Sequence, residues 1–164
     1  MKRIMFVCLG NICRSPMAEF IFKDMVKKAG LENEFIISSC ATSTDEIIGG
    51  IGNPVYPPAM RELEKHGISC AGKRAVQLKW ADYDNYDLFI GMDSNNIRNM
   101  NIMLKGDKRN KIRKLMDYTS RCGDVADPYF TDRFDIAYRD IYEGCEGLFK
   151  ALTKQNRKWY NSEE

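Results

Sequence analysis

Apolar residues along the chain follow two patterns: short compact runs, and longer stretches in which they recur every three or four positions. The compact runs are bounded by charged residues or turn formers, which is typical of strands buried within a sheet. They lie at residues 4–7 (IMFV), 34–39 (EFIISS), 87–92 (DLFIGM) and 111–116 (KIRKLM). The pattern therefore predicts four strands.

Helical spacing follows several of these runs. A first helix is expected where Pro16 is tolerated in the first turn, and Gly30 is a plausible stop. Its apolar stripe consists of Met17, Phe20, Ile21, Met25 and Val26. Further helices are expected at residues 58–66, after Asp93 as a cap, and from about Phe134 onward.

Because strands alternate with helices, the order predicts an α/β fold with right-handed crossovers. We expect a four-stranded parallel sheet with helices on both faces, Rossmann-like or flavodoxin-like. No domain boundary is visible, so residues 1–164 are expected to form a single domain. Ligands of such sheets bind at the carboxyl ends of the strands. Long loops are predicted at residues 41–58 and 117–132, and loops of this length are often functional.

Composition narrows the class of protein. The chain has 164 residues, 44% of them hydrophobic and 29% charged, as in a globular domain, and its net charge of +2 gives no global attraction to nucleic acid or membrane. The six cysteines show no CxxC pattern and the single histidine has no partner, so no metal site is expected. No signal peptide or membrane span is apparent, which favours a cytoplasmic protein with reduced thiols.

The first predicted strand ends in the stretch VCLGNICRSP, residues 7–16, directly before a helix. A loop that enters a helix points backbone N–H groups and the positive end of the helix dipole at one spot. Gly10 lets a ligand approach the backbone, and Arg14 offers a planar pair of donors for two phosphate oxygens. The same positive field favours a thiolate. We therefore expect Cys8 to be an ionised nucleophile beside a bound phosphate, the phosphate-binding loop following the first strand.

This motif differs from the nucleotide-binding pattern GxxxxGK[ST]. It matches V-C-x-G-N-I-C-R-S-P, so the chain resembles the low-molecular-weight protein tyrosine phosphatases. Other stretches resemble blocks of that family in the same order: ISSCATS, EKHGI, FIGMDSNN and VADPYF. By this resemblance, the residues that bind the phosphate are Leu9, Gly10, Asn11, Ile12, Cys13, Arg14 and Ser15.

The resemblance implies a phosphatase for phosphotyrosine proteins or small aryl phosphates that works through a phosphocysteine intermediate, with no metal or other cofactor. Inorganic phosphate would be its product and an inhibitor, and the protein is expected to be a monomer. The catalytic residues would be Cys8, Arg14 and Asp127. Asp127, followed by Pro128, would protonate the leaving phenolate and then activate water.

Three further expectations concern the loop itself. By resemblance, Asn11 and Ser15 hold its shape, and the Ser15 hydroxyl stabilises the sulfur of Cys8. Ser39 and His66 match a serine and a histidine of the buried hydrogen-bond network behind the family's loop. For His66 a helix-end role beside Gly67 is the alternative.

Cys13 is the candidate redox partner of Cys8, because the resemblance implies a reversible disulfide between the two loop cysteines. Such a bond would shield Cys8 from irreversible oxidation. The alternative role is that of a small buried apolar residue.

The pocket walls are expected to carry Tyr129 and Phe130 on one side, where they would stack on a phenyl ring. On the other side, Asp45 replaces the aromatic residue usual in the family, and residues 47–50 (IIGG) look inserted. An acid at the rim would repel acidic phosphopeptides and tolerate basic ones.

Three alternative functions remain at this point. Arsenate reductases share the fold and the C-x5-R loop, but the spacing of Cys70 and Cys122 does not suit an electron relay. Phosphoarginine phosphatases typically have threonine where this chain has Ile12. A catalytically silent module that only binds phosphate would not need the acid Asp127.

Overall fold

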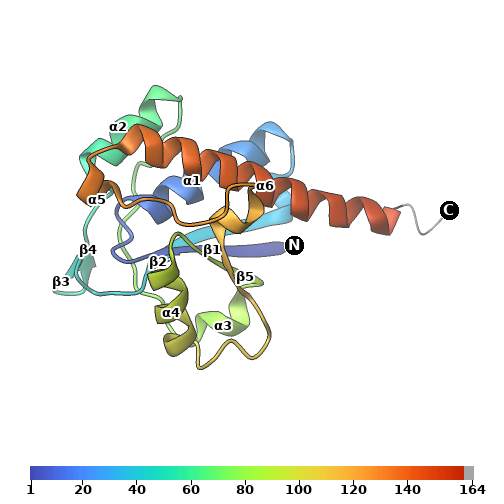
Figure 1. The fold of residues 1–164 in the computed structure, drawn as a ribbon, viewed down its shortest axis with the longest axis horizontal. Helices are drawn as coiled ribbons and strands as arrows, with labels where there is room; N and C mark the ends of the chain where they lie inside the picture. Colours follow the sequence, from blue (N-terminus) through green and yellow to red (C-terminus); the bar gives the residue numbers. More distant parts are fainter. Residues whose placement is uncertain (161–164) are drawn as a thin grey trace.

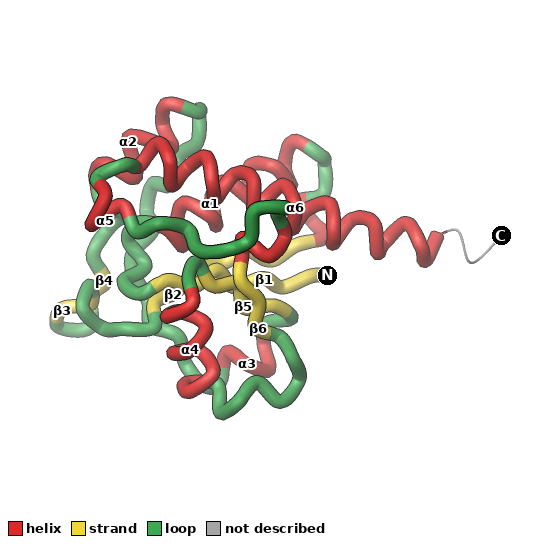
Figure 2. The backbone as a smooth tube through the Cα atoms, viewed as in Figure 1, coloured by secondary structure: helices red, strands yellow, loops and turns green. Residues whose placement is uncertain are grey.

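The structure is a computed structural model that describes residues 1–160; residues 161–164, the end of the predicted domain, lie outside the described residues. A four-stranded sheet runs through its centre (Figures 1 and 2). All its neighbouring strands are parallel, in the order β2-β1-β5-β6. The strands are β1 (Lys2–Cys8), β2 (Phe35–Ala41), β5 (Leu88–Gly91) and β6 (Ile112–Lys114). This confirms the predicted parallel sheet.

Strand β1 lies between two neighbours, and both of its faces are covered. Ile4, Phe6 and Cys8 belong to one hydrophobic cluster, whereas Met5 and Val7 belong to another on the opposite face. Side chains alternate across a strand, so an apolar run without polar interruptions is what this position requires. Cys8 is the last residue of the strand and is 4% exposed.

Helices cover both faces of the sheet, as predicted (Figure 1). On one side α1 packs against β1, β2 and α6, and α6 also contacts α2; α3 and α4 lie on the other side. Their bounds are α1 (Arg14–Lys28), α2 (Pro57–Lys65), α3 (Asp82–Asn85), α4 (Ser94–Met103) and α6 (Phe134–Tyr160). Within residues 1–160, no helix combines the length and the apolar character that crossing a membrane requires.

The predicted loop at residues 41–58 contains a small antiparallel hairpin that the sequence analysis missed. Its strands are β3 (Ile47–Ile48) and β4 (Ile51–Gly52). Gly49 and Gly50 form the two-residue turn with φ of 59° and 78°, the conformation that such tight hairpin turns need. The segment that looked inserted is therefore an ordered hairpin at the periphery of the molecule, labelled β3 and β4 in Figure 1. It lies before α5 (Pro128–Thr131) in the chain.

The fourth predicted strand is shorter than expected. β6 ends at Lys114, and Leu115–Tyr118 form a turn of 3-10 helix. Leu115 is fully buried and occupies the space over Gly144 of α6, where a Cβ atom would lie 2.5 Å from its Cγ. Packing against α6 thus ends the strand early, which an apolar run alone does not reveal.

The carboxyl ends of β1, β2 and β5 meet at one edge of the sheet. From β1 the chain passes through α1 to β2, which lies on one side of β1 in the sheet. The next strand of the sheet, β5, lies on the other side of β1. The strand order therefore reverses between β1 and β5, and such a reversal leaves a crevice for ligands. The loop after Cys8 lies at this position.

Candidate active site

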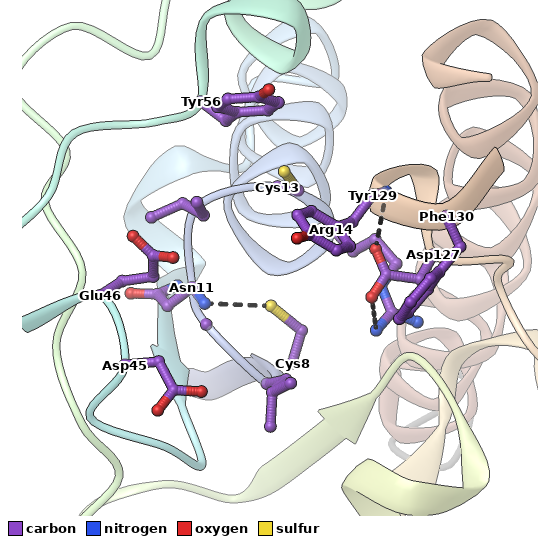
Figure 3. Close-up of a pocket in the computed structure, with 13 residues that line it drawn as sticks. Cys8, Asn11, Cys13, Arg14, Asp45, Glu46, Tyr56, Asp127, Tyr129 and Phe130 are labelled. Carbon is purple, nitrogen blue, oxygen red and sulfur yellow. Dashed lines mark hydrogen bonds and ion pairs between the residues drawn. The ribbon is translucent and has the colours of Figure 1, made fainter. Parts of the chain in front are cut away.

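A pocket of about 450 Å³ opens over the loop that joins β1 to α1 (Figure 3). Its lining is Cys8, Leu9, Gly10, Asn11, Ile12, Cys13, Arg14, Asp45, Glu46, Tyr56, Asp127, Tyr129 and Phe130. All but one of the predicted phosphate-binding residues therefore surround a single cavity. Ser15 is the exception, because it is buried behind the loop.

The sulfur of Cys8 has two hydrogen-bond partners from the loop. The backbone N–H of Asn11 donates to Sγ over 3.3 Å, and the Ser15 hydroxyl lies 3.0 Å from it. Asn11 adopts a left-handed conformation with φ of 60°, which asparagine tolerates better than most residues. Donors of this kind stabilise negative charge on a sulfur atom.

Asn11 links the loop to the strands behind it. Its side-chain amide donates to the hydroxyls of Ser15 and Ser39 over 2.8 and 2.9 Å, and its carbonyl oxygen accepts the N–H of Val76 over 3.1 Å. Both N–H groups and the oxygen of this buried amide thus have partners, as burial demands. The shape of the loop therefore depends on one asparagine side chain.

A buried carboxylate fixes the direction of this chain of hydrogen bonds. Glu19, 4% exposed, can only accept when ionised, so the Ser39 hydroxyl donates to it over 2.6 Å. The lone pairs of Ser39 then accept from Asn11. Because the Ser15 hydroxyl also accepts from Asn11, its own proton is free to point at Cys8. This proton has one other acceptor among the described residues, the Cys40 carbonyl at 3.5 Å, and the shorter contact of 3.0 Å favours the sulfur.

Two lysines balance the charge of Glu19. Lys23 lies 2.5 Å away on the outside, 43% exposed, whereas Lys73 lies 3.5 Å away with a side chain only 13% exposed. Lys73 also donates to the backbone carbonyl of Ser39 over 2.9 Å. Sequence reasoning missed both Glu19 and Lys73. The available signal for Glu19 was its position four residues after Ser15, on the same face of a helix.

The prediction for His66 is corrected by the structure. Its ring stacks on Tyr138 with centroids 3.7 Å apart and lies 3.6 Å from a carboxylate oxygen of Glu62. It caps the carboxyl end of α2 and is 43% exposed, so it belongs to the α2–α6 contact. Ser39 does lie in the network behind the loop, where Lys73, and not His66, contacts it.

Arg14 is buried and held by carboxylates. One terminal nitrogen donates to Asp93 and to the Val125 carbonyl, both over 2.8 Å, and the other lies 3.5 Å from Asp127. Burial alone lowers the pKa of this guanidinium, but the charges of Cys8, Asp93 and Asp127 outweigh burial and raise it. The site therefore keeps a permanent positive charge beside the sulfur.

Asp93 was predicted only as a helix cap, and it has a second contact. Its Oδ1 accepts the N–H of Asn96 over 2.8 Å in a capping box at the start of α4, while its Oδ2 binds Arg14. Its position directly after β5, at the same edge as Cys8, was the available signal for this contact.

Asp127 stands at the mouth of the pocket. It is the N-cap of α5, with Oδ1 accepting the N–H of Tyr129 over 3.0 Å, and its side chain is 27% exposed. Tyr129 and Phe130 are 78% and 82% exposed, so neither side chain belongs to the hydrophobic core. In Figure 3 these residues lie across the loop from Asp45 and Glu46.

Cys13 differs from Cys8 in its surroundings. Burial, followed by the nearby charges of Cys8 and Asp127, raises its pKa to about 12. Cys13 is therefore a protonated thiol near neutral pH.

A cysteine at the end of a central parallel strand, with loop amides, a buried arginine and a carboxyl group around it, defines a cysteine-based α/β phosphatase. A family model described as low molecular weight phosphotyrosine protein phosphatase matches residues 3–158. The chain belongs to this family, whose members are protein-tyrosine phosphatases.

Individual relatives agree over nearly the whole chain. The low molecular weight protein-tyrosine-phosphatase YfkJ of Bacillus subtilis (strain 168) is 40% identical over 161 residues, covering 96% of this chain and 99% of that protein. Its crystal structure superposes with a TM-score of 0.89 at 39% identity, covering 94% of this chain and 96% of that one. The low molecular weight phosphotyrosine protein phosphatase of Schizosaccharomyces pombe is 37% identical over 155 residues, or 92% and 96% of the two chains.

A more distant likeness concerns another phosphorylated residue. A structure of YwlE, described as an arginine phosphatase, has a TM-score of 0.80 at 26% identity and covers 94% of this chain and 98% of its own. The fold alone therefore does not decide which phosphorylated residue is the substrate.

The two lysines beside Glu19 provide a test of the network. We expect Lys73→Ala to lower the free energy of unfolding by about 2 kcal/mol, because it leaves a buried carboxylate poorly compensated. Lys23→Ala is the matched control, and removal of this more exposed partner should cost less than about 1 kcal/mol. Urea unfolding at pH 7 measures both values. Equal losses would contradict a structural role for the buried lysine.

Proposed function

We propose that the protein hydrolyses phosphotyrosine in two steps, with Cys8 as nucleophile, Arg14 as phosphate ligand, and Asp127 as acid and then base. The observation that carries the proposal is that Cys8, Arg14 and Asp127 line one pocket, where the Cys8 sulfur lies on the same side of the loop as Arg14 and Asp127 (Figure 3). A phosphate held by the loop amides and Arg14 would present its phosphorus atom to this sulfur.

In the first step the Cys8 thiolate attacks phosphorus, and the bond from phosphorus to the phenolic oxygen breaks. Asp127 donates its proton to that oxygen, because phenolate is a poor leaving group at neutral pH (the pKa of tyrosine is about 10). Arg14 and the loop N–H groups balance the charge on the transferred phosphoryl group. The products are a phosphocysteine on the enzyme and a tyrosine side chain of the substrate that carries its phenolic proton again.

In the second step Asp127 takes a proton from water, and the water oxygen attacks the phosphocysteine. The sulfur leaves as a thiolate, stabilised by the N–H of Asn11 and the hydroxyl of Ser15. Inorganic phosphate is released and, because it fits the same loop, competes with substrate as an inhibitor.

Phosphotyrosine suits this pocket better than phosphoarginine does. The exposed rings of Tyr129 and Phe130 offer apolar faces to a phenyl ring, and Ile12 adds an apolar side chain to the loop. Arsenate reduction is a weaker alternative because the spacing of Cys70 and Cys122 does not suit an electron relay. A silent binding role is weaker because a binding module would not need an acid at the position of Asp127. We further propose that the enzyme acts as a monomer in the cytoplasm, where reducing conditions keep Cys8 a thiol.

An assay on the reduced protein in the presence of EDTA tests the proposal. We expect turnover of a phosphotyrosine peptide that vanadate inhibits, and slower turnover of a phosphoarginine peptide. Cys8→Ser should lower kcat by at least about three orders of magnitude while phosphate still binds. Cys122→Ser is the matched control. Its thiol is exposed and does not line the pocket, so this variant should retain activity. Turnover of Cys8→Ser near the wild-type rate would contradict the proposal.

The acid role of Asp127 has a separate test in the leaving group. Asp127→Asn should lower kcat/KM for phosphotyrosine about 10²–10⁴-fold, and less for p-nitrophenyl phosphate, whose leaving group needs less protonation. kcat/KM is the quantity to compare, because it excludes the hydrolysis step shared by both substrates. Asp132→Asn is the control; its left-handed backbone, φ 55°, accommodates asparagine. Equal losses on the two substrates would argue against proton donation.

We also propose that Cys13 protects Cys8 from oxidation. Hydrogen peroxide would convert the Cys8 thiolate to a sulfenic acid, and the Cys13 thiolate would then displace hydroxide to form a disulfide. The raised pKa of Cys13 makes its thiolate scarce at pH 7, so capture of the sulfenic acid should accelerate as pH rises.

Recovery from peroxide measures this protection. After peroxide and then dithiothreitol, the wild type should regain most of its activity, whereas Cys13→Ser should regain much less because Cys8 proceeds to the sulfinic acid. Cys122→Ser serves again as the control and should recover as the wild type does. Full recovery of Cys13→Ser would exclude the protective role.

A further inference from the structure

The wall of the pocket opposite Asp127 carries two adjacent carboxylates, Asp45 and Glu46 (Figure 3). Asp45 is exposed at the rim, whereas Glu46 is half-buried and lies against the phosphate loop. A Cβ atom on Gly10 would come within 3.2 Å of the Glu46 Cγ. Two acids therefore stand beside a site that receives an anion.

The charges around the pocket are unevenly distributed. Among the described residues that line it, the acids are Asp45, Glu46 and Asp127, and Arg14 is the one cation. Arg14 is 4% exposed and already contacts Asp93 and Asp127. The positive charge of Arg14 therefore lies at the bottom of the pocket. The rim, which would contact the rest of a substrate, carries the negative charges of Asp45 and Glu46.

The acidic wall is held in place by hydrogen bonds. Asn53 donates its backbone N–H to the Glu46 carbonyl and its side-chain amide to the Glu46 carboxylate, both over 2.8 Å. The Asn53 carbonyl accepts the N–H of Ala75 over 2.9 Å, and Arg74 donates to the Gly52 carbonyl over 3.0 Å. The carboxylate is thus fixed before any substrate arrives, and one of its oxygens is free of this contact.

We propose that Asp45 and Glu46 form an acidic subsite that selects phosphotyrosine segments with a lysine or arginine next to the phosphotyrosine. The proposal rests on the phosphotyrosine phosphatase activity proposed above. The loop amides and Arg14 bind the phosphate, the aromatic wall takes the ring, and the acidic subsite takes the neighbouring basic side chain. A glutamate or aspartate at that substrate position meets like charge and is disfavoured.

The size of the effect follows from the exposure of the subsite. Ion pairs at an exposed rim are individually weak, and reversing the substrate charge replaces attraction by repulsion. We therefore expect about a tenfold preference in kcat/KM for a lysine-flanked over a glutamate-flanked peptide at 0.1 M salt. The preference should shrink toward unity at 1 M salt, where the screening length falls from about 10 Å to about 3 Å.

Three phosphotyrosine peptides that differ only in the flanking residues, lysine, alanine or glutamate, test the proposal. The measured quantity is the ratio of kcat/KM for the lysine and glutamate peptides within each variant, because this ratio does not depend on overall activity. Asp45→Asn combined with Glu46→Gln should reduce the ratio to within about twofold of unity. The control is Glu32→Gln combined with Glu34→Gln, which removes the same charge from the opposite end of the sheet, before β2.

The outcomes separate this proposal from the one it rests on. Turnover of the alanine peptide with a lysine-to-glutamate ratio near unity in the wild type would overturn the acidic subsite and leave the phosphatase activity standing. A ratio that falls equally in the control variant would also overturn it, since the preference would then come from net charge. Failure to turn over any of the three peptides in the reduced enzyme would instead contradict the proposed activity.

Discussion

In the proposed reaction a thiolate and a phosphate ester, both negative, have to meet at the end of β1, and this electrostatic repulsion is the constraint on which the rest of the site depends. The loop amides and the first turn of α1 supply partial positive charge, and Arg14 supplies a full one. Arg14 is buried and fixed by Asp93 and the Val125 carbonyl, so its charge is in position before a substrate binds. The central place of β1 in the sheet brings Arg14 of α1 together with its acceptors, Asp93 after β5 and the Val125 carbonyl in the loop before α5.

The chain of hydrogen bonds behind the loop extends the same principle into the core. Glu19, balanced by Lys23 and Lys73, compels Ser39 to donate toward it and so sets the orientation of the Asn11 amide. A carboxylate at the far end of the chain thereby leaves a proton of Ser15 for the sulfur. Burying such a network is stabilising only when every member is satisfied, and this one is complete.

The fold could be predicted from the sequence because the apolar runs and helical stripes are strong signals, and the cysteine loop because its residues are contiguous. The side chains that hold the loop could not be predicted, since Glu19 on α1 and Lys73 in the segment after α2 are far apart along the chain. They meet only because both contact Ser39 of β2. For His66 the sequence led to a wrong prediction. The family resemblance placed it behind the loop, whereas it lies at the carboxyl end of α2 and stacks on Tyr138. The hairpin at residues 47–52 depends on the left-handed backbone conformation of two glycines. Its strands are only two residues long, which is too short for an alternating pattern to predict them.

The central claim is that Cys8 itself carries the phosphoryl group during turnover. The most direct measurement is to quench the reaction of labelled phosphotyrosine peptide within milliseconds and locate the label by mass spectrometry of the digested protein. The account predicts one phosphate on the peptide that contains Cys8, linked through sulfur, and its accumulation where hydrolysis of the intermediate is slowed. Turnover at full rate with no phosphate on Cys8 at any time, or with the label on another residue, would contradict the account.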